Sequence, residues 1–278
     1  MRVLRLKILY GLVLPCLFLL IWQHFAVEKN NPALIPRVEA VVSVLAHGMS
    51  NIDELGTSSL AWNTIISLFR VFCGFFLAVI VGVPLGIAMG YSRRFYAVVN
   101  PFVEMFRPLC PIAWIPFAMA VFGLHSVINV FGIRYSDTIL DTVQLAQLFI
   151  IFYGGFFPVL LNTVHSVKSV KKLWIESARS LGATRGQILV KIIAPASLPA
   201  VLTGIRIGLG VSWMVIIAAE MFPGPDLGIG YVLMYAADQG EMAIVVACMF
   251  VIGLIGLVIN NGLQSIAGRI SGWQALER

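Results

Sequence analysis

The stretch Val71–Gly90 reads VFCGFFLAVIVGVPLGIAMG and contains no charged residue. About 20 apolar residues in an α-helix cross the hydrocarbon core of a bilayer, so this stretch predicts a transmembrane helix. The chain as a whole is also strongly apolar: of its 278 residues, 59% are hydrophobic and 12% are charged, whereas about a quarter of a soluble domain is charged. Such a chain has too little polar side chain to cover a water-facing surface. The sequence therefore predicts an all-α integral membrane protein.

Further uncharged stretches predict the other transmembrane helices. With Val71–Gly90 they give about six spans, which places both chain termini on the same side of the membrane. The fifth of the six extends back past Arg206 to Pro199. The further stretches are Ile8–Val27, Leu109–Ile133, Thr142–Val164, Ile207–Ala219 and Met242–Gly268.

The positively charged residues predict the orientation of these spans. Loops rich in Lys and Arg stay in the cytoplasm, and only Lys29, Arg37 and Arg134 fall in the opposite loops. The net charge of +6 is thus a topology signal and not a nucleic-acid-binding surface, and both termini are predicted to be cytoplasmic. The fourteen basic residues on the predicted cytoplasmic side are Arg2, Arg5, Lys7, Arg93, Arg94, Arg107, Lys168, Lys171, Lys172, Arg179, Arg185, Lys191, Arg269 and Arg278.

Two features of the spans predict how they pack. Span two carries glycines at four-residue spacing, Gly82, Gly86 and Gly90, and small residues at this spacing let helix backbones approach closely in lipid. Span three opens with three prolines between Arg107 and Pro116, which predicts a bent, cavity-lining segment. A polar external hairpin, Asn129–Asp141, is expected after it.

The four cysteines and four histidines are scattered, with no metal or redox spacing. No metal site and no cofactor are expected. The chain also lacks the G-x-x-x-x-G-K-[ST] phosphate cradle. A chain without this cradle is not expected to hydrolyse ATP by itself.

The longest internal cytoplasmic stretch, His165–Leu198, predicts two short helices, Ser169–Ser180 and Arg185–Ile193. Between them, Gly182 suits the left-handed turn at a helix end, and Thr184 can cap the next helix. An amphipathic helix–turn–helix on the cytoplasmic face predicts a docking element, because its apolar residues need either a partner surface or the chain's own spans.

Two prolines, Pro195 and Pro199, are expected to end the second loop helix and begin the following span. The apolar residues proposed to contact a partner surface are Leu173, Ile188, Leu189 and Ile192.

The residues Glu176–Gly182 read ESARSLG; nine residues then precede Ile192, and Pro195 follows three positions after it. This spacing resembles the EAA loop of ABC importer permeases, whose pattern is E-A-A, three residues, G, nine residues and I-x-L-P. Ser177 replaces the first alanine of that pattern and Ala194 replaces its leucine. Both changes are mild.

Other segments resemble the sulfonate, taurine, nitrate and bicarbonate branch of these permeases. They are Thr203–Gly210 (TGIRIGLG), Ala218–Met221 (AAEM), Arg107-Pro108 and Ala113–Pro116 (AWIP). The resemblance covers about residues 59–263.

The resemblance implies a type I ABC importer permease fold and a transport subunit that is not an enzyme, with ATP hydrolysis on separate partner subunits. Two copies, a homodimer, would pair with two cytoplasmic ATP-binding subunits and one solute-binding protein, periplasmic or lipid-anchored, in a bacterial plasma (inner) membrane. Residues 1–58 would form an N-terminal transmembrane helix and external segment, and residues 59–278 the permease core, with the coupling loop at 165–198. In such permeases the loop inserts into a groove on the ATPase, and by position Glu176 would brace it through a charge-assisted contact. The implied coupling residues are Glu176, Ser177, Ala178, Leu181, Gly182, Ala183, Thr184, Ile192 and Pro195.

Ionisable residues within membrane spans are costly and are often functional. Arg70 and Arg206 are therefore candidates for attracting an anion along the translocation pathway, with Trp213 and Glu220 as further candidates for its lining. The alternative for each arginine is snorkelling to the interface or pairing with a carboxylate such as Glu104.

The function that follows is ATP-driven import of a small solute, an oxyanion of the sulfonate or taurine, nitrate or bicarbonate type by resemblance. One alternative is a permease of the same fold for another small organic solute such as a vitamin precursor. An ion-coupled secondary transporter is a second, but it requires intramembrane carboxylates or paired broken helices. The predicted spans have no carboxylate at mid-depth and no visible repeat.

Overall fold

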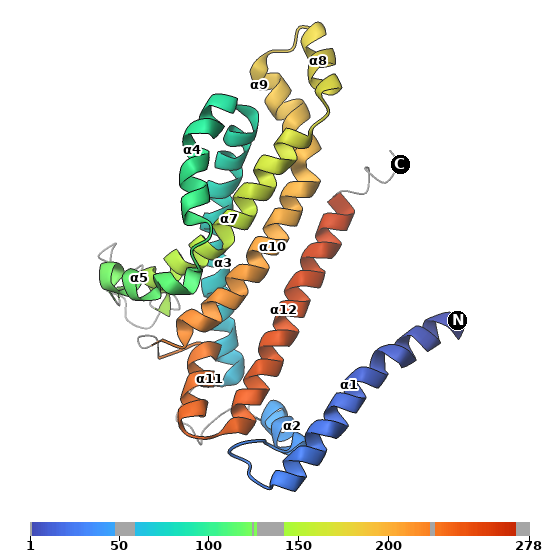
Figure 1. The fold of residues 1–278 in the computed structure, drawn as a ribbon, viewed down its shortest axis with the longest axis vertical. Coiled ribbons are helices and arrows are strands. Elements are labelled where there is room, and N and C mark those ends of the chain that lie inside the picture. The colour runs from blue at the N-terminus through green and yellow to red at the C-terminus, as the bar shows by residue number, and fades with distance from the viewer. Residues whose placement is uncertain (1, 48–58, 124, 127–141, 223–225, 271–278) are drawn as a thin grey trace. The chain divides into compact units, whose positions relative to one another are not determined.

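The computed structural model describes residues 2–47, 59–123, 125–126, 142–222 and 226–270. Over these residues the chain is helical and contains no β-strand, in agreement with the predicted all-α class (Figure 1). The predicted hairpin Asn129–Asp141 lies outside the described residues. The main helices are α1 (Arg2–Lys29), α2 (Val38–His47), α3 (Leu60–Tyr91), α4 (Arg93–Phe106), α5 (Ile115–Phe122), α7 (Leu145–Ser169), α8 (Lys172–Ser180), α9 (Arg185–Ile188), α10 (Ala194–Glu220), α11 (Ile229–Asp238) and α12 (Met242–Ile270).

Four of the described helical segments are long and apolar enough to cross a membrane: Leu60–Tyr91, Leu145–Ser169, Arg185–Glu220 and Met242–Arg269. A fifth span forms if α4 and the following segment Pro111–Phe122 are counted together as one broken span. Helix α1, with 28 residues, covers the first predicted span. The fold is therefore consistent with about six transmembrane helices.

The third predicted span differs from the expectation in where it begins. Helix α4 starts at Arg93, capped by the Ser92 hydroxyl, which accepts a hydrogen bond from the Phe95 amide at 3.3 Å. It ends at Phe106, and the chain then bends by 85° into the segment Pro111–Phe122. The bend predicted from the prolines is confirmed, because each proline removes a backbone donor. No helix begins at Leu109: α4 ends at Phe106, and the next helical segment begins at Pro111.

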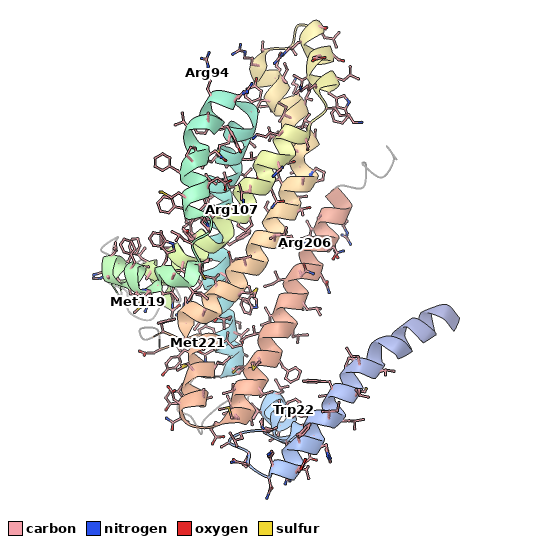
Figure 2. The ribbon with its side chains drawn as sticks, viewed as in Figure 1. Trp22, Arg94, Arg107, Met119, Arg206 and Met221 are labelled. Carbon is pink, nitrogen blue, oxygen red and sulfur yellow. The ribbon has the colours of Figure 1, made fainter. Side chains whose placement is uncertain are left out.

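The helix α4 separates Arg107 from the basic residues Arg93 and Arg94 at its start. Arg107 follows the last residue of α4, so a 14-residue helix, about 20 Å long, separates it from Arg93. Figure 2 shows Arg94 at one end of α4 and Arg107 at the other. Arg107 therefore lies deeper along the helical bundle than the basic residues with which it was grouped.

The chain divides into two compact units, and the first combines Met1–Ile65 with Leu227–Gly253. In this unit the Trp22 and Phe250 rings stack with their centroids 6.2 Å apart. The Val38 amide at the start of α2 donates to Gln23 Oε1 at 3.0 Å, which ties α2 back to α1.

The second unit, Ile66–Asp226 with Leu254–Arg278, contains the bundle that positions the site. Its centre is α7, which lies side by side with α10 (Figure 1) and carries buried residues over most of its length. Helix α3 packs on α7 through the predicted glycines. A Cβ atom added at Gly86 would lie 2.6 Å from Thr163 Cβ, and one added at Gly90 would lie 2.5 Å from Val167 Cβ. Only glycine permits this approach, so the packing role predicted for these residues is confirmed.

Candidate functional site

The predicted coupling loop is a helical hairpin at one end of α7 and α10 (Figure 1). Helix α8 ends at Ser180, and Gly182 follows with φ of +79°. The Gly182 amide donates to the Arg179 carbonyl at 2.9 Å, and the Ala183 amide donates to the Ala178 carbonyl at 3.0 Å. These bonds satisfy the last carbonyls of α8. The predicted left-handed turn is confirmed, and glycine is favoured there by the backbone conformation, since no described atom lies within 4 Å of an added Cβ.

Thr184 begins the second loop helix through a capping box. The Gln187 amide donates to Thr184 Oγ1 at 3.4 Å, and the Thr184 amide donates to Gln187 Oε1 at 2.8 Å. The pair satisfies two of the amides that have no partner within the helix. The capping role predicted for Thr184 is confirmed.

The prolines after the loop were expected to end one helix and begin the next, but they lie within a continuous helical segment. A π-helical turn, Leu189–Ile193, joins α9 directly to α10, and the segment Arg185–Glu220 is one unbroken helical span of 36 residues. Pro195 lies in the first turn of α10, next to this turn, where the wider hydrogen-bond spacing tolerates a missing donor. The second half of the loop and α10 therefore form one continuous helix, about 54 Å long.

The loop exposes a different apolar set from the predicted one. Leu173 is 68% exposed, as expected for a docking residue, and Leu181 at the turn is 86% exposed. Val190, which was not predicted, is 69% exposed. Ile188 is only 1% exposed because it packs with Val167 and other residues of its own chain, so the expectation that it contacts a partner was wrong.

The remaining predicted loop residues fall into two groups. Leu189 and Ile192 are half-buried, as are Ala178 and Ala183, which pack against the cluster around Ile188. The other members, Glu176, Ser177, Gly182, Thr184 and Pro195, are exposed. The loop thus has an inner face fixed to the bundle and an outer face open to a partner.

Two of the pathway candidates form a buried ion pair. Arg70 Nη1 lies 2.7 Å from Glu220 Oε1, and the two side chains are 1% and 0% exposed. Arg70 Nε also donates to the Thr142 carbonyl at 2.9 Å, and the Ser67 hydroxyl donates to Glu220 Oε2 at 2.8 Å. The alternative of carboxylate pairing therefore applies to Arg70, with Glu220 in place of Glu104. In this conformation neither side chain lines an open path.

The other two candidates occupy different environments on α10. Trp213 is buried at 3% exposure, and the Cβ position of Gly256 lies 3.6 Å from its ring. Arg206 lies along α10 (Figure 2). It is half-buried and makes no hydrogen bond or ion pair with the part of the chain that the structure describes.

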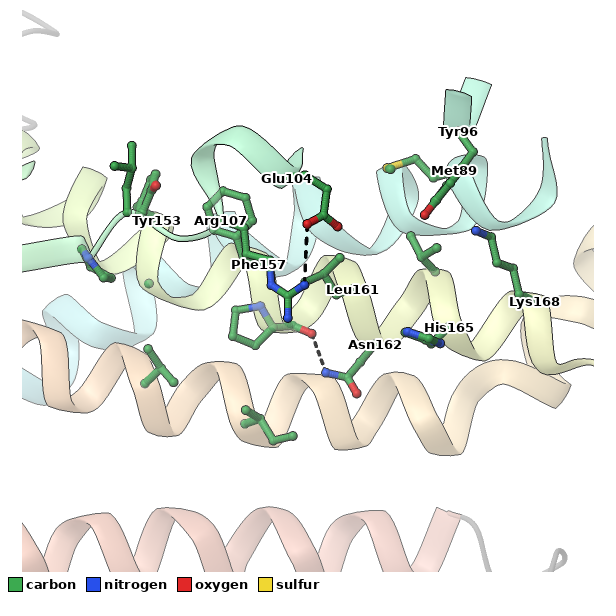
Figure 3. A pocket seen from close by; sticks show the side chains of 17 residues that line it. Met89, Tyr96, Glu104, Arg107, Tyr153, Phe157, Leu161, Asn162, His165 and Lys168 are labelled. Carbon is green, nitrogen blue, oxygen red and sulfur yellow. Dashed lines mark hydrogen bonds and ion pairs between the residues drawn. The ribbon is translucent and has the colours of Figure 1, made fainter. Parts of the chain in front are cut away.

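The bundle also contains a cavity of about 580 Å³, lined by residues of α3, α4, α7 and α10 and of the bend after α4. Its polar side chains come mainly from the C-terminal end of α4 and the C-terminal half of α7 (Figure 3). Met89, Phe157, Leu161 and Ile207 add apolar surface. The polar lining consists of Tyr96, Glu104, Arg107, Tyr153, Asn162, His165 and Lys168.

Two cations are held at the wall of this cavity. Lys168 Nζ lies 3.1 Å from the centroid of the Tyr96 ring, a cation–π contact that joins α7 to α4. Arg107 Nη1 lies 3.9 Å from Glu104 Oε2, and both of these side chains are more than half exposed. The Tyr153 hydroxyl donates to the Phe106 carbonyl, which fixes the end of α4 beside them.

The sequence interpretation missed this cluster. It assigned Arg107 and Lys168 to cytoplasmic loops and used them only as topology signals. One local signal was present: Asn162, His165 and Lys168 recur at three-residue spacing, which places them on one face of α7. Nothing in the sequence pairs that face with α4.

Comparison with known proteins identifies the family. Residues 82–272 match the family described as "Binding-protein-dependent transport system inner membrane component". The chain belongs to this family. It is the membrane-spanning permease subunit of an ABC importer.

The relatives of this permease include a Methanocaldococcus jannaschii protein named as an ABC transporter permease, 44% identical, with the alignment covering 95% of this chain and 91% of that protein. The bicarbonate transport system permease protein CmpB of Synechococcus elongatus is 31% identical, covering 90% and 86%. The taurine transport system permease protein TauC of Escherichia coli is 30% identical, covering 91% and 84%.

Among solved structures, the permease fold is similar to a chain from the inward-facing MetNI methionine ABC transporter. The TM-score is 0.61, the identity is 18%, and the similarity covers 76% of this chain and 95% of that one. The type I importer fold predicted from the sequence is confirmed. At this identity the likeness concerns the fold alone.

Proposed function

We propose that this permease imports a small oxyanion, which an external solute-binding protein delivers and cytoplasmic ATPases drive across the membrane. Two copies of the chain would form the pathway, with two ATP-binding subunits beneath them. The observation that carries the proposal is the exposed hairpin α8–α9, which presents Leu173 and Leu181 to a partner and continues as one helix into the bundle. A partner that moves this hairpin would move α10 with it.

The mechanical connection is direct. Because α9, the π-helical turn and α10 form one helical span from Arg185 to Glu220, a displacement at the hairpin reaches the buried Arg70–Glu220 pair without crossing a flexible joint. The π-helical turn Leu189–Ile193 lies where the helix leaves the hairpin, and such turns often occur at functional positions. We propose that ATPase closure uses this helix to change the conformation of the pathway.

The orientation follows from the coupling role. An ATPase acts in the cytoplasm, so the hairpin and the basic residues around it lie on that side, as the positive-inside rule predicts. Six spans then place both termini in the cytoplasm and α11 towards the outside. This orientation suits a plasma membrane with the binding protein on the external face.

The substrate class rests on the relatives and on charge. The names of two relatives specify bicarbonate and taurine, both of which carry negatively charged oxygen atoms. The present permease places two cations and several hydrogen-bond donors at its cavity. An oxyanion suits these groups better than a cation does, because the cavity offers Glu104 as its single anionic group within the described residues.

Uptake into proteoliposomes tests the proposal. The permease is reconstituted with its ATPase and binding protein, and labelled bicarbonate, nitrate and taurine are supplied outside with ATP inside. We expect ATP-dependent uptake of at least one of them, and none when the vesicles contain ADP. Uptake of a neutral or cationic solute in place of all three anions refutes the substrate class but leaves the permease role intact. Uptake driven by an ion gradient without ATP refutes the coupling mechanism.

A further inference from the structure

The cavity between α4 and α7 lies on the coupling side of the bundle. It extends along α7 from Tyr153 to Lys168, about 22 Å of helix, and its last lining residue lies four residues before the hairpin helix α8 begins at Lys172. Its volume of about 580 Å³ lies within the range of small-molecule sites, roughly 300 to 1,000 Å³. A carbonate, nitrate or sulfonate ion with its hydration water fits this space.

The groups at the wall are mostly donors. Arg107 has five N–H donors in a planar fork that matches the oxygens of a flat or tetrahedral anion. Its contact with Glu104 is long, at 3.9 Å, and exposed, so the carboxylate neutralises it weakly. Lys168 adds an ammonium group held over the Tyr96 ring. The cavity therefore carries a net positive charge with donors from two helices.

The α7 face supplies further polar contacts. Asn162 donates one amide hydrogen to the Pro158 carbonyl at 2.8 Å, which fixes the orientation of the side chain and leaves its second hydrogen available to a ligand. His165 lies one turn further along, between Asn162 and Lys168 (Figure 3). These three side chains form a polar track that runs towards the hairpin end of the helix.

We infer that this cavity is an oxyanion site near the coupling end of the permease, in which Arg107 and Lys168 attract the anion and Asn162 and His165 bind its oxygens. The inference deepens the proposed function and rests on it for the identity of the anion. It assigns the attraction to residues other than Arg70, whose charge is neutralised by Glu220. The same chemistry would suit the phosphate of a lipid headgroup, so the test must separate the two ligands.

Charge-selective thiol labelling tests the electrostatics of the cavity without requiring transport. Leu161→Cys places a thiol at the cavity wall in a full complex whose four native cysteines have been replaced. The labelling rate is measured in nanodiscs with an anionic and with a cationic methanethiosulfonate of similar size. We expect the cavity to raise the anionic-to-cationic rate ratio about five- to tenfold above that of a free thiol. The double change Arg107→Gln and Lys168→Gln should abolish this preference.

Ala33→Cys, in the segment between α1 and α2, is the matched control, because it is exposed and lies outside both the cavity lining and the hairpin proposed to contact the ATPase. Its rate ratio should not respond to the double change. A cavity thiol without charge preference, or with a preference that survives the double change, overturns the inference.

The two ligand sources are separated by protection. Bicarbonate, nitrate or taurine should slow labelling at Leu161→Cys in nanodiscs of purely zwitterionic lipid. Protection by added anionic lipid alone, with none from the free anions, assigns the cavity to a headgroup and overturns the inference.

Uptake then distinguishes a failure of this inference from a failure of the proposed function. In proteoliposomes, Arg107→Gln and Lys168→Gln should each lower oxyanion uptake several-fold, and Lys168→Arg should restore most of it because the charge remains. If the unaltered complex imports an oxyanion and neither Gln variant is slower, this inference fails and the proposed function stands. If the unaltered complex imports none of the three anions, the proposed function fails independently of the labelling result.

Discussion

The buried pair Arg70–Glu220 gives the sharpest prediction about stability. At 2.7 Å and an effective dielectric constant of about 20, the attraction between the two charges is about 6 kcal/mol. Removing both ions from water costs several kcal/mol each, so the net contribution of the pair is small. The large effect comes from breaking it: Glu220→Ala leaves the Arg70 charge buried without its counter-ion, which should destabilise the fold by about 3–5 kcal/mol.

A double variant distinguishes the effect of the two charges from the effect of the side-chain volume. Replacing both partners with methionine removes the uncompensated charge and keeps most of the volume, so stability should return to within about 1–2 kcal/mol of the unaltered protein. Ser67 and the Thr142 carbonyl lose their partners in this variant, which accounts for the remaining deficit. The matched control is Glu104→Gln, whose exposed contact at 3.9 Å should change stability by about 0–1 kcal/mol.

The assay measures the midpoint of thermal unfolding of the purified complex in detergent, monitored by fluorescence-detected size exclusion. Uptake is then measured for the variants that remain folded. Glu220→Ala should lower the midpoint clearly, and the double variant should recover it. A single variant as stable as the unaltered complex, or a double variant no better than the single, would refute the reasoning. If the double variant recovers stability but not uptake, the ion pair takes part in transport as well as in folding.

Other variants test the hairpin, the helix packing and the orientation. Gly182→Val places a branched side chain on a backbone with φ of +79°, which costs about 1–2 kcal/mol and should reduce substrate-stimulated ATPase activity. Gly186→Ala, in the open first turn of α9, should not reduce it. Normal stimulation in both variants would contradict a coupling role for the turn. Gly86→Val pushes a side chain into Thr163 and should lower complex stability by about 1–3 kcal/mol, while Gly262→Ala, with open space around it, should be near neutral in a thermal melt. Lys171→Cys should resist an impermeant thiol reagent in sealed cells, and rapid labelling from outside would reverse the proposed orientation.

The parts of this protein that local chemistry specifies were predictable from the sequence. Apolar runs indicated the spans because the hydrocarbon core requires about 20 apolar residues of helix. Gly182 and Thr184 indicated the hairpin because a left-handed turn and a helix cap each depend on the backbone within a few residues. Gly86 and Gly90 indicated close helix packing, although not the partner helix. The resemblance to the EAA loop led to the family that the comparisons then identified.

Local signals failed where a break or a junction depended on its neighbours. Each proline lacks a backbone N–H donor, but whether this breaks the helix depends on the turn that precedes the proline. Pro195 follows a π-helical turn and lies in an unbroken helix, whereas Pro108 and Pro111 lie at an 85° bend. Helix α4 was not predicted for a related reason: it carries charges near both of its ends, and a search for uncharged stretches excludes such a helix.

Only the tertiary structure decided which charged groups meet. Arg70 and Glu220 are 150 residues apart, and the packing of their helices brings them into one closed pair. The same packing sets Arg107 at the end of α4 opposite the polar face of α7 that carries Lys168, so that two cations counted as topology signals line one cavity. Hydropathy and capping act over one or two helical turns, and the sequence by itself determined the features that depend on them. Pairing between distant side chains depends on the register in which helices pack, which is fixed by close contacts such as Gly86 on Thr163 and is encoded in no single segment.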